Sequence, residues 1–157
     1  YPRGQYTEVG ENTSLLSECA EGGDCSLEGS LKELAGYRME RAREMMTAAE
    51  GNLEIGQYKT SLNRSYYAIF HAMRAANILK GFDSSKHSGV IAFFNKEYLK
   101  ENILDRNLSV IIKNSAFLRE KSDYDDFFIA SKKEAEKQLI DAKTFLKAVE
   151  EYLTKES

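Results

Sequence analysis

Apolar residues recur with the period of an amphipathic helix from Ser30 to the C-terminal end of the 157-residue chain. The pattern predicts helices over about residues 30–50, 57–80, 87–99, 105–121 and 131–153. In the last helix, apolar positions alternate steps of four and three, a stripe that packs against other helices: Ala135, Leu139, Ala142, Leu146, Val149 and Leu153. Strand patterns are almost absent, so the sequence predicts an all-α fold, an up-and-down antiparallel bundle of about five helices.

Helix ends are marked by short polar and glycine signals. Ser30–Glu33 and Ser131–Glu134 have the spacing of a capping box, in which the serine and glutamate side chains close free backbone N–H groups at a helix start. Gly51–Asn52 predicts the end of the first helix. Gly81 predicts the end of the second helix, because glycine readily takes the left-handed conformation that closes a helix.

Residues 1–29 differ from the rest of the chain in charge and composition. They carry one base and six acids, a net charge of −5, which leaves +2 for residues 30–157. They also hold the only proline, both cysteines and five of the ten glycines. We therefore expect a mostly irregular, acidic N-terminal extension over residues 1–29 and one helical domain over residues 30–157. The overall acidity then does not argue against an anionic partner for the domain.

Several function classes find no support in the sequence. No window approaches the roughly 18 uninterrupted apolar residues of a membrane span, so no membrane partner is expected. Cys19 and Cys25 could form a disulfide, but free thiols are favoured, and with them a cytoplasmic location. The glycine-rich phosphate loop, the dinucleotide-binding fingerprint and the His-Glu-x-x-His motif are all missing. We expect no metal and no cofactor.

One group of residues with chemical potential lies on the second predicted helix. Arg64 and His71 are seven residues apart, and seven helical residues turn through about 700°, so the two lie on almost the same line. Tyr67 lies between them and completes the stripe. The other positions nearby are apolar or aromatic, so the helix is expected to be buried around much of its circumference. A buried arginine needs an acidic partner, a second subunit or an anionic ligand.

The Arg64–His71 stripe has two interpretations at this point. In the first, Arg64 forms a salt bridge with Glu120 or Asp123, and His71 is a core histidine bonded to a carbonyl. In the second, the pair performs phosphodiester chemistry: imidazole can transfer protons near neutral pH, and a guanidinium stabilises charge on a phosphoryl group. Residue spacing alone leaves both interpretations open.

The stretch from Ser30 to Leu153 resembles the HEPN domain family, in particular its small stand-alone prokaryotic branch. Four segments carry the resemblance, and their order and spacing together are specific: Tyr37–Ala42, Asn63–Ala72, Ser85–Ile91 and Leu118–Tyr124. The resemblance implies a helical bundle that dimerises through the face bearing the motif. Many members are metal-independent ribonucleases, often toxins encoded beside a minimal nucleotidyltransferase antitoxin.

The family signature is an arginine, four to six intervening residues, and a histidine, which Arg64 and His71 match at the long limit. By this resemblance His71 would assist proton transfer at an RNA 2′-hydroxyl, and Arg64 would hold the scissile phosphate. Two such pairs would share a solvent-accessible cleft at the two-fold axis of a homodimer. Ser65 stands where active toxins often have Asn, Asp or His. Met73 stands where toxins silenced by their nucleotidyltransferase have tyrosine, which puts that modification in doubt.

Further residues near the motif are secondary candidates for substrate binding. Asn63 and Tyr67 flank Arg64 on the same helix. His87 stands at a predicted helix start, where it could help bind phosphate. Capping of that helix by Ser85 or Ser88 is the more economical explanation of the segment.

Arg119 is a weaker substrate-binding candidate, because an intrahelical pair with Asp123 explains it more simply than RNA contact does. The domain's small net charge means that RNA affinity would need a local basic patch, such as Arg38, Arg41 and Arg43. We therefore keep three hypotheses. They are an RNA-cleaving homodimer of toxin type, a non-catalytic nucleotide- or partner-binding module on the same scaffold, and a plain interaction bundle.

Overall fold

The computed structural model describes residues 26–156, which form a helical bundle without strands. Its elements are α2 (Ser26–Glu54), α3 (Tyr58–Leu79), α4 (His87–Phe94), the π-helical turn η1 (Asn95–Leu99), α5 (Leu108–Tyr124) and α6 (Lys132–Glu156). The predicted all-α fold is thus confirmed. The part of the expected extension that covers residues 1–25, with Cys19 and Cys25, lies outside the described residues.

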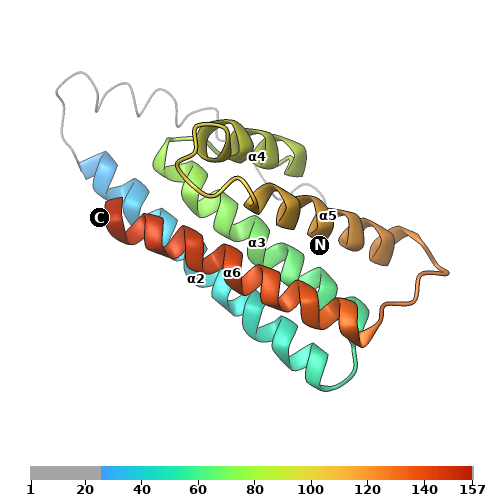
Figure 1. Ribbon diagram of the computed structural model, residues 1–157. Helices are drawn as coiled ribbons and strands as arrows, with labels where there is room; N and C mark the ends of the chain where they lie inside the picture. The colour runs from blue at the N-terminus through green and yellow to red at the C-terminus, as the bar shows by residue number, and fades with distance from the viewer. Residues whose placement is uncertain (1–25, 157) are drawn as a thin grey trace.

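Three long helices lie alongside one another, and the shorter helices cover α3 from the other side (Figure 1). Helices α2 and α3 are joined by the short turn before Tyr58 and run in opposite directions, whereas α6 runs in the same direction as α3. Helix α3 packs against each of α2, α4, α5 and α6 and therefore forms the centre of the bundle. This arrangement places the Asn63–Ala72 segment in the middle of the molecule.

The core forms where these helices meet α3. It contains large aromatic side chains from α3, η1 and α6, among them Phe70, Tyr98 and Phe145, all of them buried. The predicted stripe of α6 is confirmed, since every member from Ala135 to Val149 is buried and Leu153 is partly buried. A buried aromatic side chain is worth several kcal/mol, so this core fixes the position of α3.

The predicted ends of the first helix are wrong at both sides. Helix α2 begins at Ser26, so Ser30 lies inside it and Ser30–Glu33 is not its capping box; residues 26–29 are helical rather than irregular. Glu28 lies in the first turn, where a negative charge is favourable. The helix also continues through Gly51 to Glu54, because a glycine weakens a helix by only about 1 kcal/mol relative to alanine.

The other boundary predictions agree more closely with the structure. Ser131 and Glu134 form the reciprocal capping box, in which Glu134 N–H donates to Ser131 Oγ at 3.1 Å and Ser131 N–H donates to Glu134 Oε1 at 3.3 Å. Gly81 has a φ of 75° and ends α3 as predicted. Its N–H donates to Ile78 O and the next N–H donates to Asn77 O, the hydrogen bonds of a Schellman motif. Helix α5 begins three residues later than predicted and ends at Tyr124.

Candidate active site on α3

Helix α3 is buried along almost its whole length between Ser61 and Ile78. The exceptions are Asn63, Arg64 and Arg74, which are partly buried. The predicted burial of the helix is therefore confirmed, but Arg64 lies at the edge of the buried surface rather than within it. Water can reach such a guanidinium, so the full desolvation penalty of a buried charge does not apply to Arg64.

Arg64 lies beside a surface hollow of about 320 Å³, lined by Lys59, Thr60, Asn63, Arg64, Ser122 and Asp123. Its Nη1 donates to Met45 Sδ at 3.5 Å. Within residues 26–156 it forms no ion pair with an acid, and Glu120 and Asp123 do not fill that role. The first interpretation of Arg64, a salt bridge to one of these two residues, is therefore not what the structure shows.

His71 lies inside the bundle with only 4% of its surface exposed. Its ring lies 5.8 Å from the Phe70 ring and 6.3 Å from the Tyr67 ring, measured between centroids. Burial, together with the positive charges of Arg74, Arg41 and Arg38, lowers the pKa of His71 to about 3. The imidazole is therefore neutral at pH 7, the protonation state that a general base requires.

Arg64 and His71 thus share one helix but not one environment. Arg64 borders the hollow, and the residues that line this hollow do not include His71. In the single chain the two residues do not line a common solvent-accessible cleft of the kind that the resemblance implies. Tyr67, the residue between them, is buried and contacts the His71 ring rather than the hollow.

His87 belongs to an aromatic cluster with residues of α3. Its Nδ1 is hydrogen-bonded to the Tyr66 hydroxyl at 2.7 Å, and its ring stacks on Phe70 with centroids 4.2 Å apart. Neither Ser85 nor Ser88 caps α4, because the N-cap residue is Lys86 and no side chain caps that end. The predicted serine cap is thus wrong. Ser84 Oγ accepts a hydrogen bond from Lys86 N–H instead, forming a turn before the helix.

Arg119 reaches the same cluster from α5. Its Nε lies 3.1 Å from Asp123 Oδ2, so the predicted intrahelical pair is confirmed. Its Nη2 also donates to the Tyr67 hydroxyl at 3.3 Å. The spacing of residues along α5 could not indicate this contact, because Tyr67 lies on α3. Asn63 Nδ2 lies 3.5 Å from Asp123 Oδ1 and links this cluster to the hollow beside Arg64. The structure therefore brings Asn63, Tyr67 and Arg119 together.

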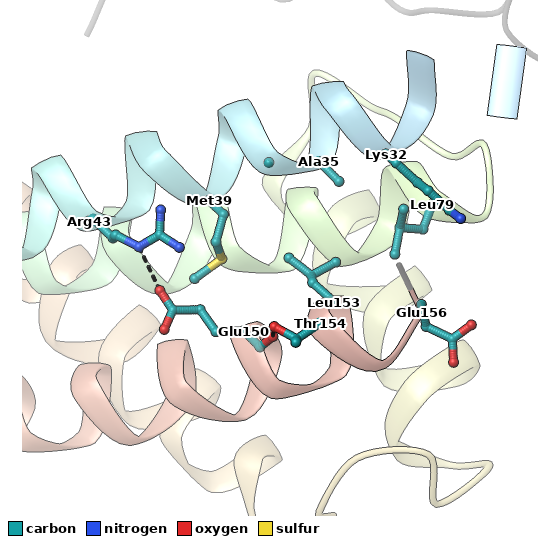
Figure 2. A pocket seen from close by; sticks show the side chains of 10 residues that line it. Lys32, Ala35, Met39, Arg43, Leu79, Glu150, Leu153, Thr154 and Glu156 are labelled. Atoms are coloured by element: carbon teal, nitrogen blue, oxygen red, sulfur yellow. Dashed lines mark hydrogen bonds and ion pairs between the residues drawn. The ribbon is translucent and has the colours of Figure 1, made fainter. Parts of the chain in front are cut away.

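The arginines expected to form a basic patch on α2 are each paired with an acid. Arg38 pairs with Asp83, Arg41 with Glu44, and Arg43 with Glu150. The Arg43–Glu150 pair crosses a groove of about 330 Å³ between α2 and α6, shown in Figure 2. These side chains are therefore balanced by carboxylates, and the predicted basic patch is absent from α2.

Two residues that shape the site are not among the candidates that the sequence patterns indicate. Asp83 is paired with both Arg38 and Arg74 close to His71, and no local pattern signals it because its first partner is 45 residues away. Tyr66 is one of the aromatic positions expected only to bury the helix, yet its hydroxyl is hydrogen-bonded to His87. In the described part of the chain, no three His, Cys, Asp or Glu side chains are grouped to hold a metal ion. No helix within residues 26–156 is long and apolar enough to cross a membrane.

Comparison with known proteins identifies relatives over the same part of the chain. The sequence model of the HEPN domain matches residues 35–152. A Methanocaldococcus jannaschii protein named "Putative toxin MJ0142" is 33% identical over 115 residues, covering 73% of this chain and 78% of that protein. A second protein of that organism, "Putative toxin MJ0605", is 32% identical over 115 residues, covering 73% of this chain and 85% of its own length.

Two further relatives extend the comparison. A Thermotoga maritima protein, named only as a UPF0332 protein, is 31% identical over 117 residues, covering 74% of this chain and 89% of that protein. The crystal structure of TT1696 from Thermus thermophilus superposes with a TM-score of 0.64, over 74% of this chain and 96% of that chain. At 22% identity, this last likeness shows a shared fold and nothing about activity.

Proposed function

This chain is a member of the HEPN domain family, and from that premise we propose that it is a toxin-type, metal-independent endoribonuclease that acts as a homodimer in the cytoplasm. The observation that carries the proposal is the state of Arg64. This arginine has no acidic partner within residues 26–156 and borders a hollow that Lys59 also lines. Two bases and one acid, Asp123, line the hollow, and its net positive charge suits a phosphate group.

In the proposed reaction Arg64 holds the scissile phosphate. Its guanidinium can donate two parallel hydrogen bonds to phosphate oxygens and stabilise the charge that develops on them in the transition state. Asn63 lies beside it and offers a neutral donor to the same group. Removal of a single donor to such a charge typically lowers kcat by about 10²–10³-fold.

His71 is the proposed general base. It would take the proton of the RNA 2′-hydroxyl while O2′ attacks phosphorus, and the bond to O5′ would break, leaving a 2′,3′-cyclic phosphate and a 5′-hydroxyl that takes its proton from water. Burial is the largest cause of the low pKa of His71, and positive charges from Arg74, Arg41 and Arg38 lower it further. A bound phosphate would offset the charges and raise the pKa by that part of the shift.

The homodimer is supported by exposed apolar side chains on α5. Val110, Phe117 and Tyr124 recur every seven residues and are 54%, 58% and 63% exposed. Large apolar residues that gather on a surface mark protein interfaces. Tyr124 follows Asp123, which lines the hollow beside Arg64, so a two-fold contact along α5 would bring two Arg64 hollows near one interface.

A toxin of this type would require an antitoxin, and the family points to a minimal nucleotidyltransferase. We do not expect this antitoxin to inactivate the protein by modifying the residue two positions after His71. Met73 occupies that position, has no hydroxyl, and is only 1% exposed. The proposed antitoxin would therefore act at another surface or by covering the site.

The test is cleavage of mixed RNA by the purified full chain in the presence of EDTA. We expect 2′,3′-cyclic phosphate products from the wild type and a loss of at least 10²-fold in Arg64→Ala and His71→Ala. Arg106→Ala is the matched control, because Arg106 is an exposed arginine whose one hydrogen bond goes to a backbone carbonyl. Cleavage that survives both site substitutions, or an inactive wild type, would contradict the catalytic proposal.

The burial of His71 favours one alternative, a non-catalytic nucleotide- or RNA-binding module. A base must contact its substrate, and the single chain exposes only 4% of His71. In this alternative Arg64 binds phosphate, and His71 packs in the core and does not contact the ligand. An uncleaved RNA whose binding weakens in Arg64→Ala, but not in Arg106→Ala, would support the binding module over the nuclease.

A further inference from the structure

His87 and Arg119 pack against the same two tyrosine rings from different helices. The His87 ring lies 5.6 Å from the Tyr66 ring and 5.8 Å from the Tyr67 ring, measured between centroids. The guanidinium carbon of Arg119 lies 5.3 Å and 5.7 Å from the same two centroids. Residues 32 positions apart on α4 and α5 therefore contact the same two rings, and the charge of Arg119 acts on His87; tertiary structure, not spacing along one helix, brings them there.

The Tyr66 hydroxyl determines which nitrogen of His87 carries the proton. Tyr66 is buried, and Nδ1 of His87 is the one hydrogen-bond partner of its hydroxyl among residues 26–156. A buried O–H without an acceptor is costly, so Tyr66 must donate to Nδ1. Burial also raises the pKa of Tyr66, which keeps this proton in place. The neutral His87 ring then carries its own proton on Nε2.

Nε2 of His87 has no partner in the described part of the chain, and the ring is only partly buried. Burial, Arg119 and Arg74 lower the pKa of His87 to about 4, so at pH 7 Nε2–H is a neutral donor. Arg119 forms an ion pair with Asp123 through Nε, which is buried without a hydrogen bond, and its Nη2 donates to Tyr67, while its Nη1 has no partner among these residues. Nε2 of His87 and Nη1 of Arg119 are thus two donors without a partner among residues 26–156.

We propose that Nε2 of His87 and Nη1 of Arg119 form a phosphate-binding pair that takes an RNA phosphodiester beside the one held by Arg64. Tyr66 is a positioning residue, which orients His87 through the hydrogen bond to Nδ1. Asp123 connects the two sites, because it pairs with Arg119 and lines the hollow beside Arg64. The assignment of RNA as the ligand rests on the proposed function.

The orientation of His87 can be tested without any ligand. Imidazole ¹⁵N chemical shifts of the full chain at pH 7 should show Nδ1 unprotonated and Nε2 protonated. Tyr66→Phe keeps the ring packing but removes the hydroxyl, and should shift His87 toward a mixture of the two tautomers. Tyr58→Phe on the same helix is the control and should leave the spectrum unchanged. A wild-type His87 protonated on Nδ1 would overturn the assigned role of Tyr66.

The phosphate pair itself is tested with a single-stranded RNA whose 2′-hydroxyls are methylated, so that it cannot be cleaved. We expect this RNA to shift the His87 resonances and to bind about ten-fold or more weakly to His87→Gln and to Arg119→Gln. Arg106→Gln should bind as the wild type does. Inorganic phosphate and a mononucleotide are tested as ligands in separate titrations. If they bind at His87 and the RNA does not, the site takes small phosphate ligands and the RNA assignment is overturned.

The outcomes separate this inference from the proposed nuclease. RNA that binds through Arg64 but leaves the His87 resonances and the affinities of both Gln variants unchanged would overturn the inference alone. Affinity that depends on His87 and Arg119, in a protein that cleaves no RNA, would support the inference while contradicting the nuclease. The ligand-free tautomer measurement also separates orientation from mere packing, because a purely structural Tyr66 would not fix the His87 tautomer.

Discussion

Arg38 of α2 and Asp83 of the loop between α3 and α4 form an ion pair, with Nη2 and Oδ2 2.6 Å apart and both side chains largely shielded from water. Arg74 of α3 also contacts Asp83, at 3.0 Å to both carboxylate oxygens. One carboxylate therefore ties α2, α3 and the loop before α4 together close to His71. Asp83 supplies negative charge to both of these arginines.

We predict that Asp83→Asn destabilises the protein by about 3–5 kcal/mol, because it removes the negative charge that Asp83 provides to two partly buried arginines. The free energy of unfolding, measured by urea denaturation, checks this prediction. Glu44→Gln is the control: it removes an exposed pair with Arg41, and such pairs contribute about 0–1 kcal/mol. Equal effects of the two substitutions would contradict the role assigned to Asp83.

The fold could be predicted from the sequence because its signals are local. The period of apolar residues in α6 and the capping box at Ser131 each depend on neighbours within a few turns, and both agree with the structure. The end of α2 could not be predicted from Gly51. Packing of this helix against α3 outweighs the weak helix propensity of one glycine.

The site could be predicted only where it follows one helix. Arg64 and His71 both lie on α3, as expected. Arg64 is partly buried and His71 is buried, because different neighbouring helices cover the two turns of α3. His87 contacts Tyr66, and Arg119 contacts Tyr67, across different helices. The spacing of residues along the sequence does not indicate which helices pack together. The pairs formed by the arginines of α2 depend in part on acids far away in the sequence.

Two glycines provide a matched pair of substitutions with opposite effects. Gly81 has a positive φ, so Gly81→Ala should destabilise the protein by about 1–2 kcal/mol. Gly51 lies inside α2, and a Cβ added there would meet no atom within 4 Å, so Gly51→Ala should stabilise by about 0.5–1 kcal/mol. Thermal unfolding of the two variants checks both signs, and a destabilised Gly51→Ala would show that α2 does not continue through this residue in solution.

The salt dependence of the affinity for uncleavable RNA should show whether Arg64 contacts a phosphate. If Arg64 contacts one phosphate, Arg64→Ala should reduce the slope of log K against log salt concentration by about 0.7, the value expected per phosphate on a single strand. The affinity should fall by a similar factor for RNAs of different sequence, because phosphate contacts carry no sequence information. Arg106→Ala should leave the slope unchanged. An unchanged slope in Arg64→Ala would remove this residue from the RNA interface.

The low pKa of His71 predicts a pH-dependent stability. The folded state holds His71 neutral down to a pKa of about 3, whereas in the unfolded state the ring gains a proton near its ordinary pKa of 6.5. Between these values the unfolded state binds more protons, so acid favours unfolding. The contribution of His71 is complete well above pH 6.5 and is lost as the pH falls toward 3, by up to about 1.4 kcal/mol per pH unit.

The measurement is the free energy of unfolding of the wild type and of His71→Asn between pH 7.5 and 4.5. Titration of the carboxylates and of His87 is common to both proteins and cancels in the difference between them. His71→Asn should be the less stable protein at pH 7.5, and the two stabilities should converge as the pH falls. A constant difference across this range would mean that His71 titrates normally in the folded protein and reaches solvent, which would favour its proposed contact with RNA over a purely structural place in the core.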